Sequence, residues 1–295
     1  MNGIINIYKE EDFTSFDVVA KLRGILKQKK IGHTGTLDPK AQGVLPVCLG
    51  KATKVCDLLT DKDKEYEAVL LLGVTTDTQD MTGEVLKENT VTCTEEEARA
   101  AIESFVGEYD QTPPMYSALK VNGQKLCNLA RAGIEVERKA RRVHVYEIEI
   151  LSVDLPRICM RVKCSKGTYI RTLCEDIGEK LSCGGCMETL LRTKAADFLL
   201  EEAHKLNEIE QAVKEGRIEE YIKPIDFVFQ EYPCVMIRKE YNKHLYNGNR
   251  LPKEACLEWD KKQAEKKYRV YDDKEQFIGI YEWSGDALKP VKMFL

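Results

Sequence analysis

The 295-residue sequence lacks the features that would direct it to a membrane or out of the cell. Residues 1–6 have neither the basic start nor the long apolar run of a signal peptide. No uncharged apolar stretch reaches about 18 residues, the length needed for a helix that spans a bilayer. We therefore expect a cytoplasmic protein that does not enter a membrane.

Histidine is scarce, and the common cofactor motifs are missing. The chain has only 4 histidines, so a histidine-rich metal centre is not expected. It also lacks a P-loop, a dinucleotide-binding glycine motif, a zinc-protease motif and a serine-hydrolase motif. We expect chemistry based on carboxylate, arginine, tyrosine and at most one histidine, with no cofactor and no metal.

The 11 cysteines are odd in number and scattered, which favours reduced thiols over disulfides. Cys183 and Cys186 are the only close pair, and no second pair follows at metal-binding spacing. Ordinary thiols are therefore favoured over a metal or redox site.

The formal net charge of −4 hides an uneven distribution. Basic residues dominate segments 20–60 and 157–171, whereas acidic residues concentrate in 80–110. Two interpretations stay open, a positive face for nucleic-acid phosphates and solvated charges on separate surfaces.

Hydrophobic periodicity predicts a mixed set of elements. We expect strands at 4–8, 67–73 and 142–153, the last with a bulge near Tyr146, and an ordered loop at 31–45. Helices are expected after Thr14 or Ser15, after the capping box of Thr94 and Glu97, and at 168–181 and about 201–215. Segment 111–142 is predicted to be a mobile, basic insertion that contains a short helix. Short strands at 235–238, 268–271 and 277–283 indicate a small β domain.

Asp38 is the outstanding carboxylate. It lies in a loop rich in glycine and threonine, and Pro39 restricts it to extended backbone conformations. Taken alone, an Asp-Pro pair is more often a turn than a catalytic site.

The residues around Asp38 resemble the catalytic segment of the TruB family of tRNA pseudouridine synthases. The resemblance covers about residues 1–230 well and extends loosely to the C-terminus. It rests on Gly32-His33-Thr34-Gly35-Thr36-Leu37-Asp38-Pro39, Lys64-Glu65-Tyr66-Glu67-Ala68, Thr76-Asp77-Thr78-Gln79-Asp80, Pro113-Pro114-Met115-Tyr116-Ser117-Ala118-Leu119-Lys120, Ser165-Lys166-Gly167-Thr168-Tyr169-Ile170-Arg171, and Leu190, Arg192 and Thr193, in that order.

The resemblance implies an α+β fold with two domains. Residues 1–229 would form the pseudouridine synthase catalytic domain, a mixed, largely antiparallel sheet flanked by helices, with an RNA-gripping insertion at about 111–142. Residues 230–295 would form a small β-rich PUA-like RNA-binding domain, for which a purely stabilising role is the alternative.

The same resemblance implies roles for six residues. Asp38 would be the catalytic carboxylate, paired with Arg171, while Tyr66 would stack on the target base and take part in proton transfer. Tyr169 and Leu190 would line the uridine pocket, and His33 would fill the space left by flipped bases. Without the resemblance, Tyr66, Tyr169 and Leu190 read as packing residues, Arg171 as a surface or phosphate-binding residue and His33 as a structural histidine. An arginine within ~4–6 Å would lower the carboxylate pKa by ~1–3 units.

The sequence departs from the family where members usually carry a Lys-Pro-x-Gly turn. Here the residues are Lys9-Glu10-Glu11-Asp12, so the resemblance does not define the geometry of this loop.

The implied activity is isomerisation of a uridine in the T loop of tRNA, by a monomer without an obligate protein partner. Its RNA partner would be the T stem-loop. Whether Asp38 attacks the sugar or removes a sugar proton stays open. Two alternatives are a guide-RNA-dependent pseudouridine synthase and a non-catalytic RNA-binding or tRNA-folding factor.

Overall fold

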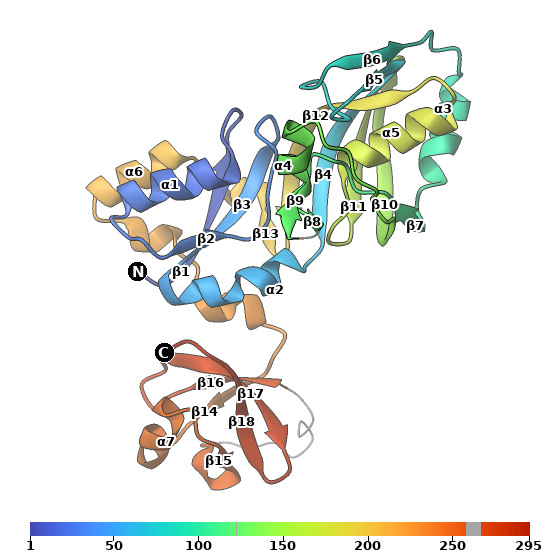
Figure 1. Ribbon diagram of the computed structural model, residues 1–295. Helices are drawn as coiled ribbons and strands as arrows, with labels where there is room; N and C mark the ends of the chain where they lie inside the picture. The colour runs from blue at the N-terminus through green and yellow to red at the C-terminus, as the bar shows by residue number, and fades with distance from the viewer. Residues whose placement is uncertain (122, 258–266) are drawn as a thin grey trace.

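The computed structural model describes residues 1–121, 123–257 and 267–295. Its main feature is a mixed sheet with the strand order β1-β3-β12-β4-β11-β10-β7, to which β2 and β13 add short edges (Figure 1). These strands are β1 Gly3–Lys9, β2 Ile31–His33, β3 Gln42–Leu49, β4 Lys64–Leu72, β7 Gly107–Gln111, β10 Arg141–Asp154, β11 Arg157–Cys164, β12 Gly185–Ala195 and β13 Phe198–Leu199. Neighbouring strands are antiparallel except β3 and β12, which pair in parallel. The predicted α+β class with a largely antiparallel sheet is therefore confirmed.

Helices lie at both ends of this sheet (Figure 1). The longer ones are α1 Ser15–Ile25, α3 Glu95–Glu103, α5 Ile170–Lys180 and α6 Leu206–Lys214, and the shorter ones are α2 Cys56–Thr60, α4 Leu126–Arg131 and α7 Asn242–Tyr246. One buried cluster packs α1 and α6 against β1 and β3, and another packs α3 and α5 against β4, β10, β11 and β12. Each cluster removes apolar side chains from water, which is the main favourable term in folding.

Several local predictions are confirmed. Thr14 caps α1 through a capping box with Asp17, and Thr94 caps α3 through one with Glu97. The bulge expected near Tyr146 is present, because the register between β10 and β11 shifts between Val145 and Glu147.

Other local predictions are wrong. Segment 31–45 is not a continuous loop, because β2 and the start of β3 flank a shorter loop of residues 34–41. The helix expected at about 201–215 begins only at Leu206, after a 3-10 turn at Leu200–Glu202. Strand β12, which lies in the interior of the sheet, was not predicted. Polar residues interrupt its apolar pattern, and two of them pair with neighbouring strands, Glu188 with Arg157 of β11 and Thr193 with Glu65 of β4.

The insertion 111–142 contains α4 and a small hairpin of β8 Lys120–Val121 and β9 Gln124–Lys125, and its residue 122 lies outside the described residues. A second hairpin, β5 Val74–Thr76 with β6 Val85–Glu88, flanks the loop that carries Asp80.

A separate five-stranded sheet follows the large sheet, in the order β14-β16-β17-β18-β15 (Figure 1). Its strands are β14 Cys234–Met236, β15 Leu251–Pro252, β16 Lys267–Tyr271, β17 Phe277–Ser284 and β18 Ala287–Met293. The three strands that we predicted are present, and β15 and β18 are additional. Residues 258–266 of the predicted C-terminal domain lie outside the described residues.

Within the described residues, no helix is long and apolar enough to cross a bilayer.

Candidate active site

The loop that carries Asp38 is fixed on two sides. The Ser15 hydroxyl at the start of α1 accepts a hydrogen bond from the Leu37 main-chain N–H at 2.8 Å. At the other end, Thr34 donates through both its main-chain N–H and its hydroxyl to the Pro46 carbonyl of β3, each at 3.1 Å. The loop therefore holds Asp38 in a defined position, as its composition predicted.

Lys9 lies beneath this loop and is fully buried. Its ammonium group donates to the carbonyl oxygens of Glu10, Phe13 and Pro39 at 3.1, 2.6 and 3.0 Å. Burial lowers the pKa of Lys9 to about 8, and the nearby Asp38 carboxylate opposes that shift. Lys9 thus joins the turn after β1 to the loop of Asp38.

The departure from the family's Lys-Pro-x-Gly turn is accommodated locally. Asp12, where the family has glycine, adopts a positive φ of 68°, a conformation that aspartate tolerates better than most residues. Its N–H donates to the Pro39 carbonyl at 2.9 Å, and its carboxylate pairs with Lys40 at 2.9 Å. The turn therefore still contacts the loop of Asp38 without the proline and glycine.

Arg171, near the start of α5, connects Asp38 to two other segments, the loop of Thr78 and Asp80 and the segment of Tyr116. Its Nε lies 3.1 Å from Oδ2 of Asp38, and its Nη2 lies 3.5 Å from Oδ1. It also donates to the carbonyl oxygens of Tyr116 at 2.8 Å and Thr78 at 3.1 Å, and its Nη1 lies 3.5 Å from Oδ2 of Asp80. Only 6% of the Arg171 side chain is exposed. This guanidinium is therefore oriented before any substrate binds.

The pKa of Asp38 is raised, which corrects part of our expectation. Burial is the largest cause, and the Asp80 carboxylate adds to it. Arg171 and Lys9 lower the pKa, as predicted for Arg171, but they do not outweigh burial. The Asp38 side chain is still 39% exposed, so a substrate can reach it.

Tyr66 projects from β4, where it pairs in register with Val162 of β11 and Arg192 of β12. Burial raises the pKa of its hydroxyl, the Arg192 guanidinium opposes this shift, and Asp38 adds a smaller upward contribution. Tyr66 is therefore a neutral hydroxyl within electrostatic range of the candidate carboxylate.

Tyr169 and Leu190 lie on different elements, and of the two only Tyr169 has an electrostatic interaction with Asp38 among those of the described residues. Tyr169 is the N-cap of α5, and its main chain exchanges hydrogen bonds of 2.8 and 3.0 Å with the side chain of Gln111. Burial raises the pKa of Tyr169. Leu190 lies on β12 opposite Ala68 and packs against the buried cluster that includes α5.

His33 ends β2 and does not share the ion pairs of Asp38 and Arg171. Its Nδ1 lies 3.2 Å from the Gly35 carbonyl oxygen, and burial lowers the pKa of the ring. The imidazole is therefore half-buried and lies outside the ion-pair network of Asp38 and Arg171.

Arg192 is one of the residues that resemble the family, but no role was predicted for it from the sequence. Arg192 is 1% exposed, and its Nε donates to the Val44 carbonyl at 2.7 Å. Its Nη2 has no hydrogen-bond partner among the described residues, and none of its atoms forms a salt bridge with them. A buried cation without an acidic partner is costly, which marks Arg192 as part of the site. Its spacing two residues after Leu190 was the only sequence signal.

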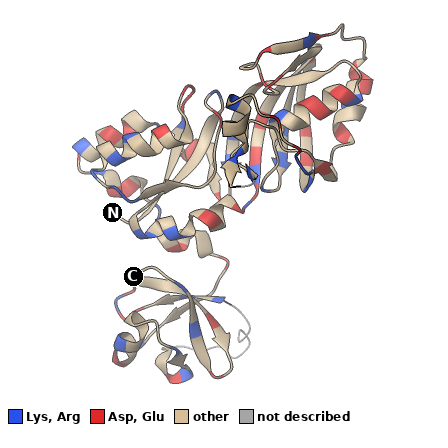
Figure 2. Cartoon of the chain, viewed as in Figure 1, with Lys and Arg blue, Asp and Glu red and all other residues tan. Residues whose placement is uncertain are grey.

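The structure explains part of the uneven distribution of charged residues along the sequence. In segment 157–171, Arg157 pairs with Glu188, Arg161 with Glu67, and Lys166 with Asp61, at distances of 2.7 to 3.0 Å. Those cations are therefore compensated within the chain. Acidic side chains gather on α3, away from the centre of the molecule (Figure 2).

The described residues contain no group of three or more His, Cys, Asp or Glu side chains arranged to hold a metal ion. Cys183 and Cys186 are free thiols, and the Cys186 thiol contacts the Met81 sulfur at 3.5 Å.

Comparison with known proteins places this site in a family. A model described as TruB family pseudouridylate synthase, N-terminal domain, matches residues 23–170, and one described as the tRNA pseudouridylate synthase B C-terminal domain matches residues 171–230. The chain is 57% identical to tRNA pseudouridine synthase B of Lachnoclostridium phytofermentans and 46% identical to that of Clostridium kluyveri, over 100% of this chain and of each relative.

Solved structures agree with this placement. A Cbf5-Nop10-Gar1 complex matches at 29% identity, and an H/ACA RNP bound to a substrate RNA containing 2′-deoxyuridine matches at 25%. Each has a TM-score of 0.73 and is matched over 99% of this chain and 85% of that chain. The chain therefore belongs to the TruB family of pseudouridylate synthases.

Proposed function

We propose that this protein is a tRNA pseudouridine synthase that isomerises a uridine in the T loop, with Asp38 as the catalytic carboxylate. The observation that carries the proposal is the two-point contact between the buried Arg171 guanidinium and Asp38, beside Tyr66. The family of the chain and the names of its relatives support the activity and the tRNA substrate.

The chemistry requires a carboxylate close to the sugar. The N-glycosidic bond breaks, the uracil leaves as an anion, the base turns, and its carbon 5 forms the new bond to the sugar. Asp38 either adds to the sugar carbon that loses the base or removes a neighbouring sugar proton. Arg171 fixes the direction of the carboxylate and favours its ionised form, which burial disfavours.

The remaining site residues bind the base in this proposal. Tyr66 stacks on the uracil and exchanges a proton through its neutral hydroxyl, while Tyr169 and Leu190 enclose the base. Arg192 lies behind Tyr66 and stabilises negative charge that develops on the uracil. His33 occupies the space that flipped bases leave in the RNA.

The RNA partner is the T stem-loop of tRNA. Segment 111–142 grips the RNA, and the Arg171 contact with the Tyr116 carbonyl links the start of that segment directly to Asp38. Residues 230–295 form a PUA-like domain that binds the RNA outside the active site, and the chain acts as a monomer.

A tritium-release assay tests the proposal. When carbon 5 of the uracil bonds to the sugar, it loses its hydrogen to water, so a tRNA transcript tritiated at that carbon releases label. We expect release by the wild-type chain without added metal or nucleotide, and none by Asp38→Asn or Asp38→Ala. Asp57→Asn, at an exposed position on α2, is the matched control and should behave like the wild type. Undiminished release by Asp38→Ala would contradict the proposed role of Asp38.

The structural match to a Cbf5-Nop10-Gar1 complex favours a guide-dependent synthase as the second candidate. The same assay separates the two, because a stand-alone enzyme acts on tRNA without guide RNA or added protein. A non-catalytic folding factor would bind the transcript but release no label in any variant.

A further inference from the structure

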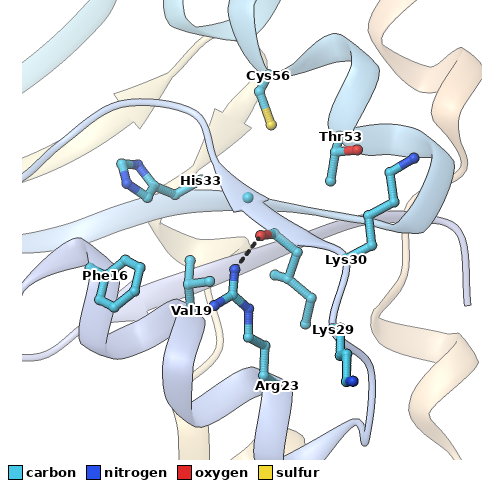
Figure 3. A pocket seen from close by; sticks show the side chains of 10 residues that line it. Phe16, Val19, Arg23, Lys29, Lys30, His33, Thr53 and Cys56 are labelled. Carbon is cyan, nitrogen blue, oxygen red and sulfur yellow. Dashed lines mark hydrogen bonds between the residues drawn. The ribbon is translucent and has the colours of Figure 1, made fainter.

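A pocket of about 550 Å³ lies between α1, β2, the 3-10 helix Gly50–Val55 and α2 (Figure 3). Its lining residues include Phe16 and Arg23 of α1, Lys29 and Lys30 of the following turn, and His33 at the end of β2. A volume of this size accommodates a nucleotide-sized group. The residues described for the active site do not account for this pocket, apart from His33.

The pocket carries positive charge without compensation. Arg23, Lys29 and Lys30 line it, are exposed and form no salt bridge with any described residue, and no lining residue is acidic. Arg23 donates only a long hydrogen bond of 3.4 Å, to the Ile31 carbonyl (Figure 3). These cations contrast with Arg157, Arg161 and Lys166, which have acidic partners within the chain. An anion is therefore the ligand that this pocket suits.

Phe16 gives the same pocket an aromatic surface. It is 62% exposed, although its neighbours Val18 and Val19 on α1 are buried in the core. The Arg23 guanidinium carbon lies 5.8 Å from the centre of the Phe16 ring. An exposed aromatic ring next to an arginine is the usual surface for stacking an unpaired base of single-stranded RNA. Folding does not explain this exposure, because the ring packs against no buried cluster.

The position of the pocket identifies its ligand. His33 lines this pocket and ends β2, from which the loop of residues 34–41 leads to Asp38. An RNA strand that contacts both Asp38 and His33 would therefore lie next to the pocket. A phosphodiester group would compensate the charge of the three cations, and an unpaired base would stack on the Phe16 ring.

We propose that this pocket is a second RNA subsite, which stacks one unpaired base on Phe16 and binds the adjoining phosphates through Arg23, Lys29 and Lys30. The inference rests on the proposed function, because it assumes an RNA substrate whose uridine reaches Asp38. It assigns the subsite to binding and not to the chemical step.

The test separates affinity from chemistry. RNA binding is measured by filter retention at several salt concentrations, and the chemical step by single-turnover tritium release at saturating tRNA transcript. The variants are Phe16→Ala, Phe16→Trp, Arg23→Gln and Lys30→Gln. Lys21→Gln is the matched control, because Lys21 lies on α1 outside the pocket with its ammonium group 4.2 Å from the centre of the Phe13 ring.

We expect Phe16→Ala to weaken RNA binding by roughly five- to tenfold, whereas Phe16→Trp should keep the wild-type affinity because it retains an aromatic ring. Arg23→Gln and Lys30→Gln should each weaken binding and lower the slope of affinity against salt by about one phosphate contact. The saturated rate of tritium release should stay at the wild-type value in all four variants. Lys21→Gln should match the wild type in both measurements.

Other outcomes overturn the inference. Wild-type affinity and salt slope in Phe16→Ala and Lys30→Gln would show that RNA does not occupy the pocket. Uridine monophosphate or inorganic phosphate that competes with the RNA at micromolar concentration would show a site for free nucleotide or phosphate. Failure of the proposed function is distinguishable, because the wild-type chain would then release no tritium at all.

Discussion

At the residue scale, opposing charges act on each carboxylate near the site. Asp38 has Arg171 and Lys9 on one side and Asp80 on the other, and burial decides the direction of its pKa. Glu175 lies on α5 one turn after Arg171, and fewer cations oppose the rise of its pKa. Burial raises its pKa to about 7, the acidic Glu179 and Asp176 contribute in the same direction, and Arg138 opposes them weakly. Its side chain also accepts a hydrogen bond from Gln79, next to Asp80.

Glu175 should make stability depend on pH. Its pKa is about 7 in the folded chain and 4.5 when unperturbed, so the folded chain binds more protons between these values. The stability contributed by the neutral carboxyl is present below pH 4.5 and is lost as pH rises through 7. We expect Glu175→Gln to raise the free energy of unfolding by about 1–2 kcal/mol at pH 8 and to leave it unchanged at pH 4, after discounting for partial exposure.

Urea unfolding at the two pH values measures this difference, with Glu103→Gln on the exposed face of α3 as the control. An equal effect of Glu175→Gln at pH 4 and pH 8 would show that the carboxyl does not titrate in this range.

At the element scale, the site depends on how closely β3 approaches β12. These two strands form the parallel pair of the sheet, with Gly43 opposite Arg192. Gly43 has a φ of +102°, and a Cβ at this position would lie 2.3 Å from the Arg192 carbonyl oxygen. The parallel pairing therefore requires glycine here, and it is this pairing that places Arg192 beneath the Asp38 loop.

Two glycine-to-alanine substitutions should change the free energy of unfolding in opposite directions. Gly43→Ala should destabilise the chain by about 3 kcal/mol or more, because neither the backbone of Arg192 nor the positive φ can accommodate a side chain. Gly24→Ala, in α1 with no atom within 4 Å of its Cβ position, should stabilise by about 0.5–1 kcal/mol. Chemical denaturation of both variants measures the difference. A mild effect of Gly43→Ala would show that β3 and β12 can separate without cost.

At the scale of the whole molecule, the C-terminal sheet shares a buried cluster with the large sheet. Phe294 and Ile280 pack in one cluster with Ile4, Val44 and Phe229. The Phe294 ring lies 6.0 Å from that of Phe229 and 5.4 Å from that of Phe277, measured between centroids. Lys54 adds a hydrogen bond of 2.8 Å to the Met293 carbonyl. The two sheets are therefore expected to unfold together.

Phe294→Ala should uncouple the two sheets. Removal of this buried ring should cost about 3–4 kcal/mol. Both tryptophans, Trp259 and Trp283, lie in the C-terminal region, so their fluorescence reports on that region while far-ultraviolet circular dichroism reports on the whole chain.

In the wild type the two unfolding transitions should coincide, and in Phe294→Ala the fluorescence transition should come first. Val291→Ala, at a 47% exposed position, should change stability by less than about 0.5 kcal/mol and keep the transitions together. Transitions that already differ in the wild type would contradict the coupling.

The sequence by itself determined the features that depend on neighbours a few residues away. The capping boxes of Thr14 and Thr94 and the bulge at Tyr146 follow from local hydrogen bonding and side-chain alternation. The Gly32–Pro39 segment also identified Asp38 as the carboxylate to examine and, by resemblance, the family.

Tertiary structure alone decided what surrounds Asp38. Arg171 is 133 residues away in sequence, and it reaches Asp38 only because α5 packs across β4 and β12. The burial that raises the pKa of Asp38, the burial of Arg192 without an acidic partner among the described residues and the unpaired cations around Phe16 also depend on segments distant in the chain. Desolvation and ion pairing depend on distance in space, and a local pattern of residues does not contain that distance.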